Sequence, residues 1–171
     1  YYLEELLNQR IVKAPNVPFY LLLLNLDRFR EVNDTLGFQY GDLLIKRVAA
    51  RVQECMAPGP HTAARLDGDT FALILIEKNV AAVMDEVRKL LSALANPFYL
   101  NGLEVHVEGC VGIAVYPEHG QEINTLIQRA DVAAELARRS GKDIEVYSKE
   151  KDRHTPRRLA LIAGLPRAME E

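Results

Sequence analysis

Two short polar stretches contain the residues whose types and spacing could do chemistry. The first begins at the end of an apolar run over residues 19–26 and includes Asn25, Asp27, Asn33 and Asp34. The second is the turn Asp67-Gly68-Asp69. Carboxylate, amide and carbonyl oxygens are ligands that a hard cation such as Mg²⁺ accepts, and a glycine lets a phosphate approach the backbone closely. Placed side by side, the two stretches could form a cation and phosphate site. The alternative is two ordinary polar turns.

The strands that must position these stretches follow from the apolar pattern. The unbroken run over residues 19–26 predicts a central strand buried on both faces. Residues 62–66 and 69–76 flank Asp67-Gly68, a dipeptide that suits a two-residue type I′ turn, so they predict a hairpin. Further strands are expected over residues 97–100, 103–115 and 144–147, with Asn101-Gly102 as the turn between the first two.

Helical periodicity accounts for most of the remaining chain. The predicted helices cover residues 2–12, a short stretch after Asp27 with Phe29 and Val32 inward, 42–55, 80–94, 123–137 closed by Gly141, and 157–169. Asp27 is expected to cap the short helix and Asp42 to open the next one. Antiparallel strands mixed with helices predict an α+β fold, with a central, mostly antiparallel sheet of about five strands flanked by helices.

Composition excludes several classes of protein. The chain has 171 residues, 49% of them hydrophobic, and a net charge of −3, which favours one domain and argues against a whole-domain nucleic-acid binder. Its apolar runs are shorter than the roughly 18 residues of a membrane span, and its first residues lack a signal-peptide pattern. We therefore expect a cytoplasmic fragment without membrane contact, although a longer parent could be membrane-anchored. Cys55 and Cys110 are expected to be buried small hydrophobes rather than redox or zinc ligands.

Several stretches, taken in order, resemble the GGDEF (diguanylate cyclase) family. They are LNLDRFR at 24–30, VNDTLG at 32–37, Gly41-Asp42, RLDGDTF at 65–71, VGIAVYP at 111–117, Arg129-Ala130-Asp131 and Ser140-Gly141-Lys142. The resemblance covers about residues 18–147. It implies a fold like that of nucleotide cyclases and polymerase palms. It also implies a homodimer in which two protomers, each holding one GTP, face each other and condense the nucleotides into cyclic di-GMP.

The resemblance also implies a role for individual residues. The metal ligands would be Asn25, the backbone carbonyl of Leu26, and Asp69. Guanine recognition would fall to Asn33 and Asp42, for which a turn residue and a helix cap are the simpler interpretations. Phosphate contacts would come from Gly68, Arg138 and Lys142.

Three departures from the family pattern predict a loss of catalysis. Asn25 stands where the family has Asp, which removes one negative charge from the metal site, so Mg²⁺ binding is expected to be weakened. Asp67 replaces the first Gly and puts a carboxylate near the phosphates. Thr70 replaces the Glu that helps to activate the attacking 3′-hydroxyl, and a missing general base costs roughly a hundred- to ten-thousand-fold in rate. No catalytic residue is therefore assigned.

The flanking regions suggest how the domain is used. The family's product-inhibition motif would need Arg at position 58 and Asp at position 61, where this chain has Pro58 and His61. Residues 1–148, with a leading helix over 1–13, are expected to form the GGDEF-like domain. Residues 149–171 resemble the charged linker helix that leads into an EAL (cyclic di-GMP phosphodiesterase) domain.

The function predicted is that of a catalytically degenerate GGDEF domain in a cyclic di-GMP signalling protein. It would be a regulatory module for an adjacent EAL domain, with GTP as an allosteric ligand. One alternative is a weakly active diguanylate cyclase that condenses two GTP molecules. A second alternative is a protein-interaction scaffold that binds no nucleotide. No nucleic-acid partner is expected.

Overall fold

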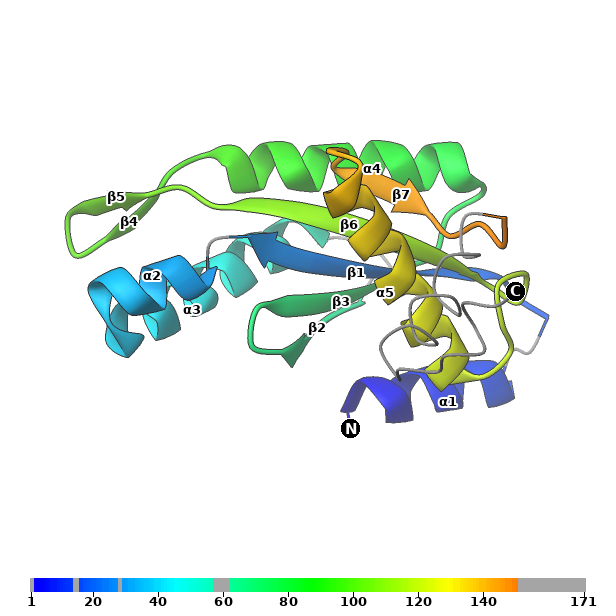
Figure 1. Cartoon of the computed structure of the whole chain (residues 1–171). Helices are drawn as coiled ribbons and strands as arrows, with labels where there is room; N and C mark the ends of the chain where they lie inside the picture. The colour runs from blue at the N-terminus through cyan, green and yellow to red at the C-terminus, as the bar shows by residue number, and fades with distance from the viewer. Residues whose placement is uncertain (1, 14–15, 28, 57–61, 151–171) are drawn as a thin grey trace, which may run out of the picture.

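The computed structural model describes residues 2–13, 16–27, 29–56 and 62–150 (Figure 1). Its helices are α1 (Tyr2–Lys13), α2 (Phe29–Leu36), α3 (Phe38–Met56), α4 (Val80–Ala95) and α5 (Ile123–Arg139). Its strands are β1 (Phe19–Asp27), β2 (Thr62–Asp67), β3 (Thr70–Leu75), β4 (Phe98–Leu100), β5 (Leu103–Val105), β6 (Glu108–Tyr116) and β7 (Ile144–Val146). Pro58, His61 and the predicted helix over 157–169 lie outside the described residues.

The main sheet has five strands in the order β2-β3-β1-β6-β7. β1 pairs antiparallel with both β3 and β6, and the short edge strand β7 runs parallel to β6. The central place of β1 agrees with its sequence, because the run Leu21–Leu24 is buried throughout. The prediction of an α+β fold around a mostly antiparallel five-stranded sheet is confirmed.

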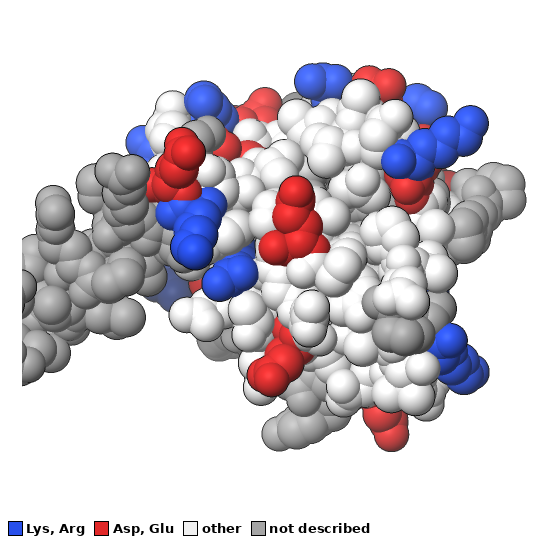
Figure 2. Space-filling view, turned by 90° about the vertical axis from the view of Figure 1, so that its right-hand side faces the viewer, with Lys and Arg blue, Asp and Glu red and all other residues white. Residues whose placement is uncertain are grey.

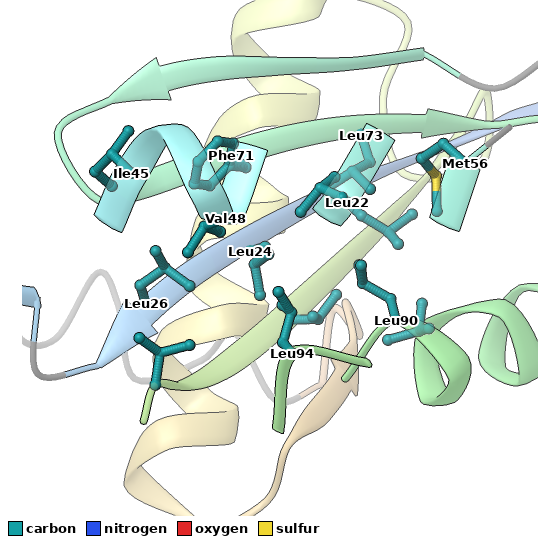
Figure 3. Packing of buried hydrophobic residues seen from close by; sticks show 14 of the residues in the cluster. Leu22, Leu24, Leu26, Ile45, Val48, Met56, Phe71, Leu73, Leu90 and Leu94 are labelled. Atoms are coloured by element: carbon teal, nitrogen blue, oxygen red, sulfur yellow. The ribbon is translucent and has the colours of Figure 1, made fainter. Parts of the chain in front are cut away.

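The two faces of β1 pack against different helices. Leu22, Leu24 and Leu26 join a cluster with residues of α3 and α4, such as Val48 and Leu90 (Figure 3). Alternate residues of the strand, from Phe19 to Leu23, pack against α1 and α5 on the other face. Because side chains alternate along a strand, Asn25 and Asp27 continue the series that faces α5. Figure 1 shows α5 crossing this face of the sheet.

The segment predicted as one strand over residues 103–115 is two strands. β5 pairs only with β4 in a separate two-stranded sheet, joined by Asn101 and Gly102 at φ 53° and 87°, as a type I′ turn requires. β6 begins at Glu108, which is paired with Asp27, the last residue of β1. Residues that precede Glu108 therefore have no neighbour to pair with in β1. The strand before it, β5, pairs with β4 in the smaller hairpin instead.

The hairpin of β2 and β3 is confirmed, but its turn differs from the prediction. The two loop residues are Gly68 and Asp69, one position later than expected, since Asp67 pairs with Thr70. A register shift in β2 between Arg65 and Asp67 accounts for the displacement. Gly68 does not have the positive φ that a type I′ turn needs, so that part of the prediction is wrong.

The α2–α3 corner also corrects the predicted boundaries. α3 begins at Phe38 rather than at Asp42, because Gly37 at φ 96° ends α2 and allows the next helix to start at once. Asp42 is therefore inside a helix and does not cap it. Asn33 lies within α2 and is not a turn residue. The capping role predicted for Asp27 stays a prediction.

Several expectations from composition can be compared with the described residues. Cys110 is buried as predicted, whereas Cys55 is half-buried, and both are free thiols. None of the described helices combines the length and apolar character needed to cross a membrane. Figure 2 shows a face on which acidic and basic side chains are scattered among uncharged ones.

Arg51 of α3 links the end of α4 to the start of β4 through hydrogen bonds and a cation–π contact. Its guanidinium donates hydrogen bonds to the carbonyls of Ala93 (3.0 Å), Asn96 (2.6 Å) and Pro97 (3.1 Å). The same group lies 3.6 Å from the centroid of the Phe98 ring, a cation–π contact. One side chain therefore satisfies the last carbonyls of a helix and covers the first residue of the following strand.

Replacing Arg51 with Leu is expected to lower the free energy of unfolding by about 1 to 3 kcal/mol, because carbonyls partly removed from water lose their donor. Urea denaturation measures the change. The control is Arg88→Leu, since Arg88 forms an exposed ion pair with Asp85 at 3.2 Å and is expected to change stability by less than about 0.5 kcal/mol. Equal effects of the two substitutions would contradict the role given to Arg51.

Candidate functional site

The end of β1 and the β2–β3 hairpin meet through two hydrogen bonds. The Thr70 hydroxyl donates to Oδ1 of Asn25 at 2.8 Å. The backbone N–H of Leu26 donates to the carbonyl oxygen of Asp69 at 2.9 Å, which extends the pairing of β1 with β3 by one step. The structure thus brings together the three predicted metal ligands and the residue that follows Asp69.

The Asn25–Thr70 contact joins two uncharged, partly buried side chains. The amide oxygen of Asn25 already accepts a hydrogen bond, and the hydroxyl that donates it comes from the next strand. A neutral amide and a hydroxyl satisfy each other without a counter-ion. The contact therefore fills the position between β1 and β3 with a neutral, hydrogen-bonded pair.

The predicted phosphate-binding cations lie at the end of α5, and both already have acidic partners. Arg138 contacts Oδ1 of Asp27 through Nε at 3.3 Å and Oε2 of Glu135 through Nη1 at 3.3 Å. Lys142 Nζ lies 3.9 Å from Oε1 of Glu145. The chain can turn sharply between these cations because Gly141 has a φ of 71°, and the N–H of Lys142 bonds back to the Ala137 carbonyl at 2.8 Å.

The predicted guanine-binding residues lie at the α2–α3 corner. The side chain of Asn33 lies directly over Gly41, where a Cβ would overlap the Asn33 amide group. Only glycine allows this approach. Asp42 follows Gly41 on α3 and is exposed. The two helices thus hold Asn33 in place and leave the Asp42 carboxylate open to solvent.

A hollow of about 420 Å³ lies between the hairpin and α5. Its lining combines apolar and polar residues: Leu23, Leu66, Thr70, Asn124, Ile127, Gln128 and Asp131. Burial and the neighbouring Glu135 raise the pKa of the Asp131 carboxyl, while Arg138 opposes the shift. Burial and Asp27 raise the pKa of the nearby Cys110 thiol, which keeps it protonated and unreactive.

Three further residues contribute to this region, and none of them was assigned a role from the sequence. Asp131 and Glu135 lie on α5 near Arg138, and the spacing of four and three residues, which puts them on one helix face, could have revealed them. Arg65 was named only as part of the stretch RLDGDTF, yet its Nε donates a hydrogen bond to the Gly68 carbonyl at 3.1 Å and so stabilises the loop. The ion pair of Arg138 with Asp27 leaves no local signal, because the two residues are 111 positions apart.

The donor set fits a magnesium ion poorly. Of the three predicted ligands only Asp69 contributes a carboxylate, and the Asn25 amide oxygen already has a hydrogen-bond partner. The adjacent Asp27 carboxylate is paired with Arg138. Among the residues that the structure describes, no three His, Cys, Asp or Glu side chains are grouped so that they could hold a metal. Protein Mg²⁺ sites usually have one or two carboxylates together with substrate phosphates, and Asp69 supplies only the smaller of these numbers.

Fold, hairpin and α2–α3 corner together have the form of a nucleotide-cyclase domain, and comparison with known proteins identifies the family. The chain belongs to the diguanylate cyclase GGDEF domain family, whose model matches residues 1–143. The resemblance found in the sequence is thereby confirmed, and the domain belongs to cyclic di-GMP signalling.

Individual relatives place the chain more closely. It is 30% identical over 169 residues to the cyclic di-GMP phosphodiesterase PdeR of Escherichia coli, covering 98% of this chain and 25% of PdeR. It is 31% identical over 171 residues to the bifunctional diguanylate cyclase/cyclic di-GMP phosphodiesterase MucR of Pseudomonas aeruginosa, with the same coverage. The GGDEF domain of TpbB from P. aeruginosa superposes with a TM-score of 0.80 at 28% identity, covering 86% of this chain and 94% of that domain. The chain thus spans about a quarter of the length of PdeR and MucR.

Proposed function

We propose that this GGDEF domain has lost diguanylate cyclase activity and serves as a guanine-nucleotide-responsive regulatory module for an attached EAL phosphodiesterase domain. In this proposal Asn33 and Asp42 hold the guanine of GTP, and Gly68, Arg138 and Lys142 lie nearest its phosphates. The observation that carries the proposal is the hydrogen bond of 2.8 Å between Thr70 and Asn25. It occupies the two positions where the family has a general base and a metal-binding carboxylate.

The chemistry of these two side chains supports the loss of turnover. Near neutral pH a threonine hydroxyl does not take up a proton from the attacking 3′-hydroxyl, and loss of a general base costs roughly a hundred- to ten-thousand-fold in rate. The neutral Asn25 amide cannot balance the charge of a divalent cation as an aspartate does, and this weakens transition-state stabilisation further. Both losses affect catalysis more than they affect binding.

Two observations support the regulatory part of the proposal. One is the α2–α3 corner, which in the proposal holds the guanine, and the other is the names of the related proteins. Asn33 remains seated over Gly41, and Asp42 remains exposed. PdeR and MucR, both about four times as long as the matched region, are named as phosphodiesterase and bifunctional cyclase/phosphodiesterase. In the proposal residues 1–148 form the GGDEF domain, and 149–171 connect it to the EAL domain.

The test is to incubate the full-length parent with millimolar GTP and Mg²⁺ while measuring thermal stability and both activities. We expect a raised melting temperature, because a ligand of the native state stabilises it, and an altered phosphodiesterase rate without cyclic di-GMP synthesis. Asn33→Ala should remove the GTP response, whereas Asp34→Ala, on the exposed side of the same helix, should keep it.

Each other outcome contradicts a defined part of the proposal. Absence of any stability change with millimolar GTP would overturn nucleotide binding and favour the scaffold alternative. Formation of cyclic di-GMP would overturn the loss of activity and favour the weak cyclase. The retained carboxylate of Asp69, a residue whose backbone carbonyl accepts the N–H of Leu26 at 2.9 Å, is the feature that favours this second candidate.

A further inference from the structure

We infer that the nucleotide pocket prefers guanosine and guanosine monophosphate to GTP and binds them without a divalent cation. This inference rests on the proposed function, from which it takes the position of the guanine. The new element is the ranking of ligands by phosphate number, which follows from the charges at the two ends of the pocket.

At the phosphate end the chain already neutralises its own cations. Arg138 lies 3.3 Å from both Asp27 and Glu135, with the Arg138 and Asp27 side chains 44% and 30% exposed. Lys142 lies 3.9 Å from the buried Glu145. Two positive groups therefore face three carboxylates before any ligand arrives. A phosphate must share or displace these partners to gain a cation.

The hairpin adds negative charge at the same end, and its cation Arg65 donates Nε to the Gly68 carbonyl at 3.1 Å. Asp69 occupies the loop, and its backbone carbonyl is used by the N–H of Leu26. The Asn25 amide oxygen, which could help to hold a cation, already accepts a hydrogen bond from the Thr70 hydroxyl and carries no negative charge. Each further phosphate thus brings charge into a region whose carboxylates outnumber its cations, and like charges repel over several ångströms.

The base end has no such conflict. Asn33 is fixed over Gly41 by close packing, and Asp42 presents an exposed carboxylate to the N–H groups that a guanine edge carries. A carboxylate accepting from such donors forms a charge-assisted hydrogen bond. The attractive part of the pocket is therefore at the end that recognises the base, and the repulsive part is at the end that meets the phosphates.

Calorimetric titration of the full-length protein with guanosine, GMP, GDP and GTP, each with Mg²⁺ and with EDTA, tests the ranking. In low salt we expect GMP to bind at least tenfold more tightly than GTP, and guanosine to bind about as tightly as GMP. Mg²⁺ should change the affinity for guanosine or for GMP by no more than twofold. Raising the salt to about 0.5 M should reduce the difference in affinity between GMP and GTP, because salt screens the repulsion between the phosphates and the carboxylates of the site. Tighter binding of GTP than of GMP, or strict dependence on Mg²⁺, would overturn the inference and leave the proposed function intact. Failure of all four ligands to bind would overturn nucleotide binding itself.

Asp27→Asn probes the ion pair directly. Freeing Arg138 from this carboxylate should tighten GTP binding about threefold or more and leave guanosine binding unchanged. The matched control is Asp85→Asn, which removes the same charge from an exposed ion pair with Arg88 on α4. Thermal melts confirm that both variants fold. An equal change of GTP affinity in the two variants, or no change in either, would contradict the role given to Arg138 and Asp27.

Discussion

The triple variant Asn25→Asp, Thr70→Glu, Asp67→Gly is expected to synthesise cyclic di-GMP at least about a hundredfold faster than the unchanged protein. Asn25 and Thr70 already contact each other across β1 and β3, so the two new carboxylates would lie at the same junction, beside Asp69. The junction would then offer a general base and the charge that a divalent cation needs. Product formation from GTP in full-length protein, measured by chromatography, should require Mg²⁺.

The single substitutions should do far less, because the residues act together. Asn25→Asp alone adds a negative charge without a base, and Thr70→Glu alone adds a base beside a neutral amide that holds the cation less well than a carboxylate does. We expect less than about a tenfold gain from either, since groups that act as one catalytic unit are not additive. Adding Asp69→Asn to the triple variant should abolish the gain. A triple variant that folds and binds GTP but stays as inactive as the parent would place the loss of turnover outside this junction.

The largest expected effect on stability comes from Gly112 of β6. A Cβ at this position would overlap the backbone of α5 at the Ala130 carbonyl and the Ala134 N–H. Backbone atoms cannot rotate away as a side chain can, so the helix must shift from the sheet, and a shift in a close-packed interior loses many contacts. We expect Gly112→Ala to lower the free energy of unfolding by about 3 kcal/mol or more.

Gly109→Ala in the same strand is the control. There a new Cβ would meet Cδ1 of Leu24, the end of a flexible side chain, at 2.8 Å, and its contact with backbone, the Asn25 carbonyl oxygen, is longer at 3.3 Å. We expect about 1 kcal/mol or less for this variant, because Leu24 can adjust its rotamer. Urea denaturation of both variants measures the difference. Equal losses would show that the fit of α5 against β6 is not set by the glycine.

Local sequence was sufficient where an element is specified by its own residues. The apolar run of β1 identified the central strand, and the periodicity of residues 80–94 located α4, whose Asn79 accepts a hydrogen bond from the N–H of Ala82 at 2.9 Å. Local sequence was not sufficient where pairing with neighbouring strands determines the bounds of an element. The end of β1 at Asp27 divides the predicted strand over 103–115, and a register shift in β2 moves the hairpin turn by one residue.

The candidate site also has a part that the sequence could predict and a part that it could not. Family resemblance indicated which side chains to consider, and the pairing of β1 with β3 places Asn25, Leu26, Asp69 and Thr70 together. No sequence pattern could show that Arg138 would lie against Asp27, because the contact depends on how α5 crosses the sheet. The charges that decide ligand preference were therefore visible one by one in the sequence, but their pairing was not.

The hydrogen bond between Asn25 and Thr70 also has a consequence for how the domain could change in evolution. Carboxylates crowded together for catalysis repel one another when no cation is bound, and active sites commonly cost stability in this way. A neutral amide–hydroxyl pair removes that repulsion, so the domain no longer depends on a cation or a nucleotide to relieve it. Under the proposed function, return to an active cyclase would require several substitutions, and the first of them would lower stability before any activity appeared. Such a barrier would make the proposed inactive state hard to leave.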